Sequence, residues 1–384
     1  MLQAAQFVEA ARELGFDFYA GVPCSFLTPF INYVIDDPAL TYLSSANEGD
    51  AVAAVAGAWV GGRKGVAMMQ NSGLGNAVSP LTSLTHVFRI PMLLICTHRG
   101  APGVADEPQH ELMGRITEQM FDTMEIAWEL FPRTAEEVGP ALARACRYME
   151  SERRPYALIM HKGTVAPHEL KTQGMPAPQV AQDIVDMTQV PTASASLSRE
   201  VALRRLVAET PELGSVLLAS TGFAGRELYA IADRPNHLYM VGSMGCISSL
   251  GLGLAMHRPD LRVVIIDGDG AALMRMGNLA TVGTYGGSNL LHLVLDNGAH
   301  DSTGAQSTVA GNVDFASIAR ACGYAHVARG NDEHALSAFL AHKAKGPAFL
   351  HLKIRTGTIA DLPRPKVTPV EVLDRLMRHC GPGK

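Results

Sequence analysis

Short apolar runs alternate with stretches of helical periodicity along the chain. In the first half, the apolar runs predict strands at Phe16–Ala20, Thr41–Ser45, Gly65–Gln70, Met92–Cys96 and Ala157–His161. The predicted helices are residues 2–14, Gly49–Val60, Asn76–Phe88, 117–130 and 134–150, and a loop runs from Thr97 to about Glu111. Because strands separated by helices need crossover connections, the pattern favours a mostly parallel sheet covered by helices.

The second half repeats this pattern after a stretch of different character. Residues 164–198 are rich in Pro, Gln, Ser and Thr, which indicates a linker across the surface. Beyond it the pattern predicts a helix at Arg199–Glu209, strands at Ser215–Ala219, Leu238–Val241, Arg262–Asp267, Asn289–Leu295 and Ala348–Leu352, and a helix at Pro369–Arg378. The predicted fold class is therefore α/β, with two doubly wound, mostly parallel-sheet domains at residues 1–165 and 198–384 and a linker at 166–197.

Composition narrows the possible partners and compartments. The net charge is −5 and no Lys/Arg run occurs, so nucleic acid is not an expected partner. The six cysteines form no C-x-x-C pair, which disfavours a zinc ribbon or a disulfide framework and indicates a reducing cytoplasm. The sequence has neither an apolar run of membrane-spanning length nor the order of a signal peptide, so no membrane partner is expected.

Polar residues follow two predicted strands of the second domain. The run RVVIIDGDG ends at Gly268, Asp269 and Gly270, and the run LLHLVLDNG reaches Asn297. Both ends are expected at the carboxyl edge of one sheet, where open α/β sheets bind ligands. A carboxylate, an amide oxygen and a nearby backbone carbonyl suit Mg²⁺, while the glycines allow close approach of a diphosphate. Either turn alone is common at strand ends, but the pair predicts a metal and phosphate site.

This pair resembles the G-D-G…N motif of thiamine-diphosphate enzymes. The resemblance implies domains of the thiamine-diphosphate-binding type, with Asp269, Asn297 and the carbonyl of Ala299 binding Mg²⁺ and the motif glycines lying by the diphosphate. One departure is Asp296-Asn297, where the family often has Asn-Asn.

Two further segments resemble the same family. The segment NEGDAVAAVAGA implies that Glu48 contacts N1′ of the cofactor's aminopyrimidine; otherwise Glu48 is a helix-start residue stabilised by the helix dipole. VGSMG at 241–245 implies that Met244 supports the bent cofactor and that the carbonyl of Gly242 accepts from its 4′-amino group, whereas Met244 could also be core filler. In this family the active site lies between subunits, which implies a homodimer or a larger homo-oligomer.

Three segments resemble the phosphonopyruvate decarboxylases, and also the sulfopyruvate decarboxylases: GVPCSFLTP at 21–29, MMQNSGLGNAVSPLTSL at 68–84 and FRIPMLLICTHRGAPGVADEPQHELMG at 88–114. The resemblance implies decarboxylation of 3-phosphonopyruvate to phosphonoacetaldehyde and CO₂ in phosphonate biosynthesis. A phosphonate needs charge-assisted donors, and the candidates are Ser25, Asn71, Asn76, His98, Arg99 and Gln109. His110, with His86 as an alternative, is the candidate proton donor.

Three other functions remain open on the sequence. A nicotinamide or flavin oxidoreductase would use a Gly-rich turn, but GLGLA at 251–255 and SGLGN at 72–76 do not form G-x-G-x-x-G between a strand and a helix. A regulatory or subunit-like protein could keep this fold without catalysis. The same enzyme class could also act on sulfopyruvate or another 2-oxo acid.

Overall fold

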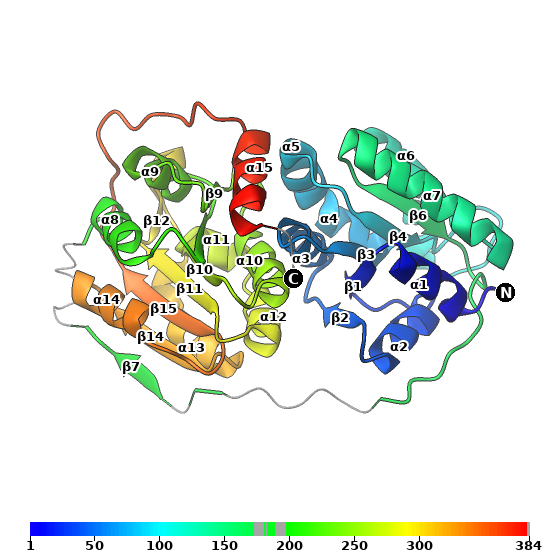
Figure 1. Cartoon of the computed structure of the whole chain (residues 1–384), viewed down its shortest axis with the longest axis horizontal. Coiled ribbons are helices and arrows are strands. Elements are labelled where there is room, and N and C mark those ends of the chain that lie inside the picture. Colours follow the sequence, from blue (N-terminus) through cyan, green and yellow to red (C-terminus); the bar gives the residue numbers. More distant parts are fainter. Residues whose placement is uncertain (173–179, 182, 189–196, 382–384) are drawn as a thin grey trace. The chain divides into compact units, whose positions relative to one another are not determined.

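A computed structural model describes residues 1–172, 180–181, 183–188 and 197–381 of the chain (Figure 1). The chain divides into two compact units, Met1–Met175 (unit 1) and Pro176–Lys384 (unit 2). This division falls within the stretch that the sequence predicts as a linker.

Unit 1 is built on a six-stranded parallel sheet with the strand order β2-β1-β3-β4-β6-β5. Its strands are β1 (Phe16–Gly21), β2 (Thr41–Ser44), β3 (Lys64–Gln70), β4 (Leu93–Thr97), β5 (Ala127–Leu130) and β6 (Tyr156–Met160). The helices that flank this sheet are α1 (Ala4–Glu13), α2 (Thr28–Asp36), α3 (Glu48–Val60), α4 (Leu74–Pro80), the π-helix η2 (Leu81–Thr85), α5 (His86–Phe88), α6 (Glu111–Thr123) and α7 (Ala135–Glu152), with short 3₁₀ turns η1 (Asn71–Gly73) and η3 (Pro108–His110) (Figure 1).

Unit 2 is built on a seven-stranded parallel sheet with the order β7-β14-β15-β11-β10-β8-β9. Its strands are β7 (Ile184–Asp186), β8 (Ser215–Ala219), β9 (His237–Tyr239), β10 (Arg262–Gly268), β11 (Leu290–Asp296), β14 (His326–Gly330) and β15 (Ala348–Lys353), and β12 (Ala299–His300) pairs with β13 (Gln306–Ser307) in a separate antiparallel ribbon. The helices are α8 (Arg199–Glu209), α9 (Phe223–Ile231), α10 (Ile247–His257), α11 (Asp269–Met274), α12 (Asn278–Tyr285), α13 (Phe315–Ala321), α14 (Glu333–Ala341) and α15 (Pro369–Cys380), with 3₁₀ turns η5 (Asp301–Thr303) and η6 (Ala310–Asn312).

The predicted α/β class and parallel sheets are confirmed, but one predicted helix is wrong. Residues 117–130 were expected to be helical throughout, whereas α6 ends at Thr123 and residues 127–130 form the edge strand β5. The chain reverses at Glu125, whose φ of 56° is incompatible with a continuing helix. The short apolar segment 127–130 is compatible with a helix or a strand, and its pairing with β6 makes it a strand.

The stretch predicted as a linker also contributes to the fold. Ile184–Asp186 form β7, which pairs in parallel with β14 at the edge of the unit 2 sheet. Both strands were missed from the sequence, since β7 has only 3 residues and neither strand carries an apolar run as long as those of β10 and β11. Part of the predicted linker, residues 173–179, 182 and 189–196, lies outside the described residues.

Each unit has its own apolar core. In unit 1 the rings of Phe7, Phe30 and Phe131 meet with centroids 4.7–5.5 Å apart. In unit 2 the seven residues of β11 are all buried, because helices cover both faces of the central strands. None of the described helices combines the length and apolar character needed to cross a bilayer.

The strand orders fix where polar strand ends gather. In unit 1, β1 has β2 on one side and β3 on the other, so the chain changes direction between β1 and β3. In unit 2 the same change lies between β8 and β10. Open α/β sheets bind ligands in the crevice at the carboxyl ends of strands that flank such a point.

Candidate active site

Glu48 stands at the start of α3, directly after β2. The side chain of the preceding residue, Asn47, caps the helix by accepting from the backbone N–H of Gly49 at 2.9 Å. The Glu48 carboxylate is therefore not used as the cap. It is half-buried, and its Oε2 accepts from Nδ2 of Asn76 at 2.8 Å. A Cβ on Gly73 would lie 2.3 Å from Oε1 of Glu48, so only glycine leaves room for this carboxylate.

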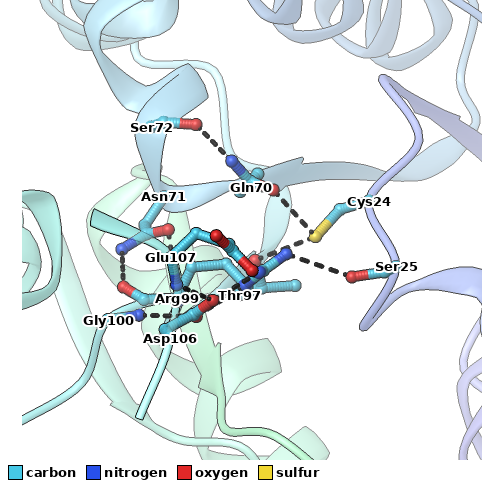
Figure 2. A network of polar contacts seen from close by, with 10 residues as sticks. All are labelled: Cys24, Ser25, Gln70, Asn71, Ser72, Thr97, Arg99, Gly100, Asp106 and Glu107. Carbon is cyan, nitrogen blue, oxygen red and sulfur yellow. Dashed lines mark hydrogen bonds and ion pairs between the residues drawn. The ribbon is translucent and has the colours of Figure 1, made fainter. Parts of the chain in front are cut away.

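Arg99 lies at the carboxyl end of β4 in a polar network (Figure 2). Its Nε and Nη2 donate to the two oxygens of Asp106, and its Nη1 donates to Oγ of Ser25 at 3.1 Å. The guanidinium also lies over the ring of Phe26, 4.7 Å from the centroid. The bidentate pair with Arg99 holds the pKa of the Asp106 carboxyl well below its usual range. The backbone N–H groups of Gly100 and Glu107 also donate to this carboxylate and act in the same direction.

Cys24 follows β1 and belongs to the same network, at the point where the strand order of unit 1 changes direction between β1 and β3. Its Sγ lies 3.3 Å from Oε1 of Gln70, at the end of β3, and 3.5 Å from Oγ1 of Thr97, at the end of β4 (Figure 2). Three neighbouring strands therefore contribute side chains to one polar group that includes Ser25 and Arg99.

Two expected substrate ligands are instead occupied within unit 1. Asn71 is fully buried; its Nδ2 donates to the carbonyl of Arg99 and to Thr117, and its Oδ1 accepts from the Arg99 N–H. Nε2 of His98 lies 2.7 Å from the carbonyl of Gly114 and must donate to it, and Nδ1 lies 3.2 Å from Nε2 of His161. We therefore drop Asn71 and His98 from the proposed substrate site.

The last two expected residues of unit 1 lie on η3. Gln109 is exposed. His110 is buried, and its Nδ1 has no hydrogen-bond partner among the described residues. A buried polar atom without a partner is costly and often marks a functional group.

The expected metal ligands of unit 2 converge on one pocket. Asp269, Asn297 and Ala299 line it together with Met244, Gly268 and Gly270, whereas Gly242 is not among its described lining residues. The pocket has a volume of about 500 Å³. Lining residues come from the ends of β10 and β11 and from the segment that follows β8, at the carboxyl edge of the sheet.

Asp269 carries the carboxylate at this pocket. It is only 3% exposed, and burial raises its pKa against the opposing hydrogen bond from Thr308. A Cβ on Gly270 would lie 2.5 Å from His300 and 3.1 Å from the methyl group of Met244. Glycine at 270 is therefore needed for these two side chains to approach the turn.

Asp296 explains the departure from the Asn-Asn pattern. Its Oδ1 accepts from the N–H of Gly298 at 3.0 Å, and its Oδ2 accepts from His351 and Lys353 at 2.7 and 2.5 Å. Burial alone would raise the pKa of Asp296, but these two donors lower it. A charged residue is thus accommodated beside Asn297 because this chain supplies a cation for it.

The donor set fits a hard divalent cation bound with a diphosphate. No group of three His, Cys, Asp or Glu side chains that could hold a metal was found among the described residues. One carboxylate, one amide oxygen and one backbone carbonyl would leave coordination places for phosphate oxygens and water, as Mg²⁺ prefers.

Several lining residues were missed from the sequence. Ser220, Thr221 and Gly222 follow β8, and Arg199, His300 and Asp301 also line the pocket. The run LLASTG carries the same signal as the other strand ends, an apolar strand followed by polar residues and glycine, and could have indicated the first three. The other three give no local signal.

The comparisons with known proteins agree with this geometry. Residues 1–126 match the N-terminal TPP-binding domain of thiamine pyrophosphate enzymes, and residues 221–352 match the C-terminal TPP-binding domain. A phosphonopyruvate decarboxylase from Streptomyces viridochromogenes is 48% identical over 98% of this chain and 94% of its own length. The chain belongs to the phosphonopyruvate decarboxylase family. It is therefore a thiamine-diphosphate-dependent decarboxylase, a carboxy-lyase.

More distant matches extend beyond this family. A sulfopyruvate decarboxylase from Methanosarcina acetivorans is 30% identical and covers 96% of this chain and 95% of its own length. The crystal structure of benzoylformate decarboxylase from Polynucleobacter necessarius covers 94% of this chain and 100% of its own, with a TM-score of 0.72 and 12% identity. At that identity the likeness shows the fold alone.

The family assignment also decides against an oxidoreductase. Of the two Gly-rich stretches, residues 251–255 lie inside the buried helix α10, and residues 72–76 run through η1 into α4. The first is not a strand-to-helix turn, and the second, which follows β3, lacks the G-x-G-x-x-G spacing of a dinucleotide-binding turn.

Proposed function

We propose that this protein decarboxylates 3-phosphonopyruvate to phosphonoacetaldehyde and CO₂, with thiamine diphosphate and Mg²⁺ as cofactors, in phosphonate biosynthesis. The observation that carries the proposal is the convergence of Asp269, Asn297 and Ala299 on one pocket. The 48% identity to a phosphonopyruvate decarboxylase over nearly the full length supports the choice of substrate.

In this proposal the two units have different tasks toward the cofactor. Asp269, Asn297 and the carbonyl of Ala299 hold Mg²⁺ with the diphosphate, and Met244 and Gly242 support the rest of the cofactor. Glu48 holds a proton at N1′ of the aminopyrimidine, with its carboxylate oriented by Asn76. Thiamine diphosphate, when bound, supplies the electron sink for loss of CO₂.

The substrate's phosphonate is held by Arg99 and Ser25. Two donors of Arg99 are committed to Asp106, so its Nη1, beside Ser25, is the donor directed at the anion. Gln109 lies in η3, which follows Arg99 in the chain, and its side chain is exposed. His110, whose Nδ1 is buried without a partner among the described residues, supplies the proton that completes the aldehyde.

We also propose an assembly and a location. The active protein is a homodimer or a larger homo-oligomer in which Glu48 of one protomer serves the diphosphate site of its partner. A cytoplasmic location is supported by the six cysteines, all of them among the described residues and none in a disulfide.

The test is a comparison of turnover with three substrates: phosphonopyruvate, sulfopyruvate and pyruvate. We expect phosphonopyruvate to give the highest kcat/KM, because 48% identity to a phosphonopyruvate decarboxylase exceeds the 30% identity to a sulfopyruvate decarboxylase. A higher kcat/KM for sulfopyruvate would replace the proposed substrate. No turnover of any of the three, with cofactors bound, would contradict the proposed function.

A further inference from the structure

Both amide atoms of Asn297 have partners that fix the orientation of its side chain. Nδ2 lies 2.7 Å from Oδ2 of Asp301, and Oδ1 lies 3.2 Å from the backbone nitrogen of Ala299. A carboxylate oxygen can only accept and a backbone N–H can only donate, so the nitrogen must face Asp301. The oxygen keeps a second lone pair that can face the pocket.

Asp301 is itself held firmly from distant parts of unit 2. The same oxygen, Oδ2, accepts from Nη2 of Arg199 at 2.7 Å and from the N–H of Gly357 at 3.1 Å. Arg199 also donates to Glu227, a fully buried carboxylate, at 3.1 Å. The side chain of Asp301 is only 7% exposed, so its position is set by charged partners rather than by water.

We propose that Asp301 is a positioning residue for metal binding: it presents the Oδ1 atom of Asn297, rather than the Nδ2 atom, to the divalent cation. Without an acceptor at this place, the Asn297 amide can turn over and direct an N–H group at the cation. This inference rests on the proposed function, in which Asn297 binds Mg²⁺. It adds a residue that the motif does not contain.

The first experiment measures Mg²⁺ affinity by calorimetry in the presence of thiamine diphosphate, without any turnover. Asp301→Ala is expected to weaken Mg²⁺ binding by about 10- to 100-fold, the usual effect of removing an outer-shell partner of a metal ligand. Asp301→Asn keeps an acceptor oxygen toward Asn297 and is expected to retain most of the affinity. Glu200→Gln, which removes a partly exposed acidic partner of Arg204, is the control for loss of charge and is expected to match the wild type.

A double-substitution cycle separates positioning from a structural role of Asp301. In an Asn297→Asp background both oxygens of residue 297 are equivalent, so no orientation needs to be fixed. In this background, Asp301→Ala should not weaken Mg²⁺ binding, because it also removes the repulsion between the carboxylates at positions 297 and 301. An equal loss of affinity in both backgrounds would show a structural role and overturn the proposal.

The remaining outcomes are also decisive. Wild-type affinity in the Asp301→Ala variant would overturn the proposal directly. If that variant does not fold, as judged by far-ultraviolet circular dichroism, Asp301→Leu, which has the same branching at Cγ but no acceptor, takes its place with the same expected loss. A wild-type protein that binds no Mg²⁺ with thiamine diphosphate would instead contradict the proposed function.

Discussion

The two units place their candidate residues at the same kind of position, the carboxyl edge of a parallel sheet, but equip it with different chemistry. In unit 1, the two charged candidate residues are each held by a partner within the unit: Glu48 by Asn76, and Arg99 by Asp106. In unit 2, oxygen atoms of Asp269, Asn297 and Ala299 converge on one pocket. Unit 1 therefore offers hydrogen-bond donors and one orientable acid, whereas unit 2 offers ligands for a cation.

In the proposed function, this difference assigns the two ends of the cofactor to the two units, although their topology is similar. A pyrimidine and a substrate anion need directional hydrogen bonds, and the side-chain pairs of unit 1 would fix their direction. A magnesium diphosphate needs oxygen ligands and close backbone approach, and unit 2 provides both through turns after β10 and β11. The predictions below are designed to separate these two roles.

The largest effect is expected from Glu48→Gln. The change keeps the shape of the side chain but removes the acid at N1′, so kcat should fall by about 10²–10⁴-fold, the range for loss of a general acid–base group. Steady-state assays with phosphonopyruvate measure the fall. Mg²⁺ affinity, measured by calorimetry, should stay at the wild-type value because unit 2 is untouched. Unchanged turnover would remove Glu48 from the site.

Arg99→Ala tests the donor that unit 1 directs at the substrate. Losing a charge-assisted hydrogen bond worth roughly 1.5–3 kcal/mol should raise KM for phosphonopyruvate about 10- to 100-fold. Arg99→Lys keeps the charge but loses the planar guanidinium, so its KM should lie between those of the wild type and of Arg99→Ala. Arg144→Ala, which removes a surface partner of Glu129, is the control. A KM that does not change in Arg99→Ala would place the phosphonate elsewhere.

Asn76→Ala should have a smaller effect, confined to the orientation of Glu48. Removing one hydrogen bond to a carboxylate should lower kcat about tenfold, with little change in Mg²⁺ affinity. The variant Asn32→Ala, which removes a hydrogen bond to the backbone of His168, is the matched control in the same unit. If KM rises instead of kcat falling, Asn76 contacts the substrate, as the sequence alone suggests.

The prediction with no expected effect on turnover concerns stability in acid, which should fall most in unit 2, where burial lowers the pKa values of His237 and His326 to about 4. His237 is fully buried, and burial lowers its pKa to about 4. Between the unfolded pKa of about 6.5 and this value, the unfolded chain binds a proton that the folded chain does not, so stability falls as pH decreases. The loss should reach about 3 kcal/mol near the lower pKa.

His237→Gln should reduce this pH dependence, and the part due to His326 should remain. Urea unfolding followed by far-ultraviolet circular dichroism at about pH 7 and at about pH 4.5 measures it. Both tryptophans, Trp59 and Trp128, lie in unit 1, so tryptophan fluorescence reports that unit separately. An equal acid sensitivity in wild type and variant would show that His237 is not its cause.

The parts of this account that the sequence predicts are those encoded locally. Buried strands such as β10 and β11 are continuous apolar runs, and the residues that follow them, Asp269 and Asn297, are polar in an apolar context. Parallel strands carry such residues to one edge, which is why the pocket of unit 2 could be expected before its geometry was known.

The parts that the sequence does not predict depend on pairs of residues far apart in the chain. Arg199 and Asp301 are 102 residues apart, and nothing near either one indicates the other. Asn76 and Glu48 are 28 residues apart, and the same Asn looked equally suited to a phosphonate. His98 and Asn71 were expected at the substrate for the same reason, since polar residues at strand ends can also tie neighbouring strands together.

In the proposed active site, one cofactor lies between two chains, with Glu48 from one chain and the metal ligands from the other. The most direct test mixes two inactive variants, Glu48→Gln and Asp269→Ala, under conditions that exchange subunits. A mixed dimer then holds one site with both changes and one site with neither, so phosphonopyruvate decarboxylation should return to a fraction of the wild-type rate. Mixtures that form mixed dimers but stay as inactive as either variant alone would contradict the account.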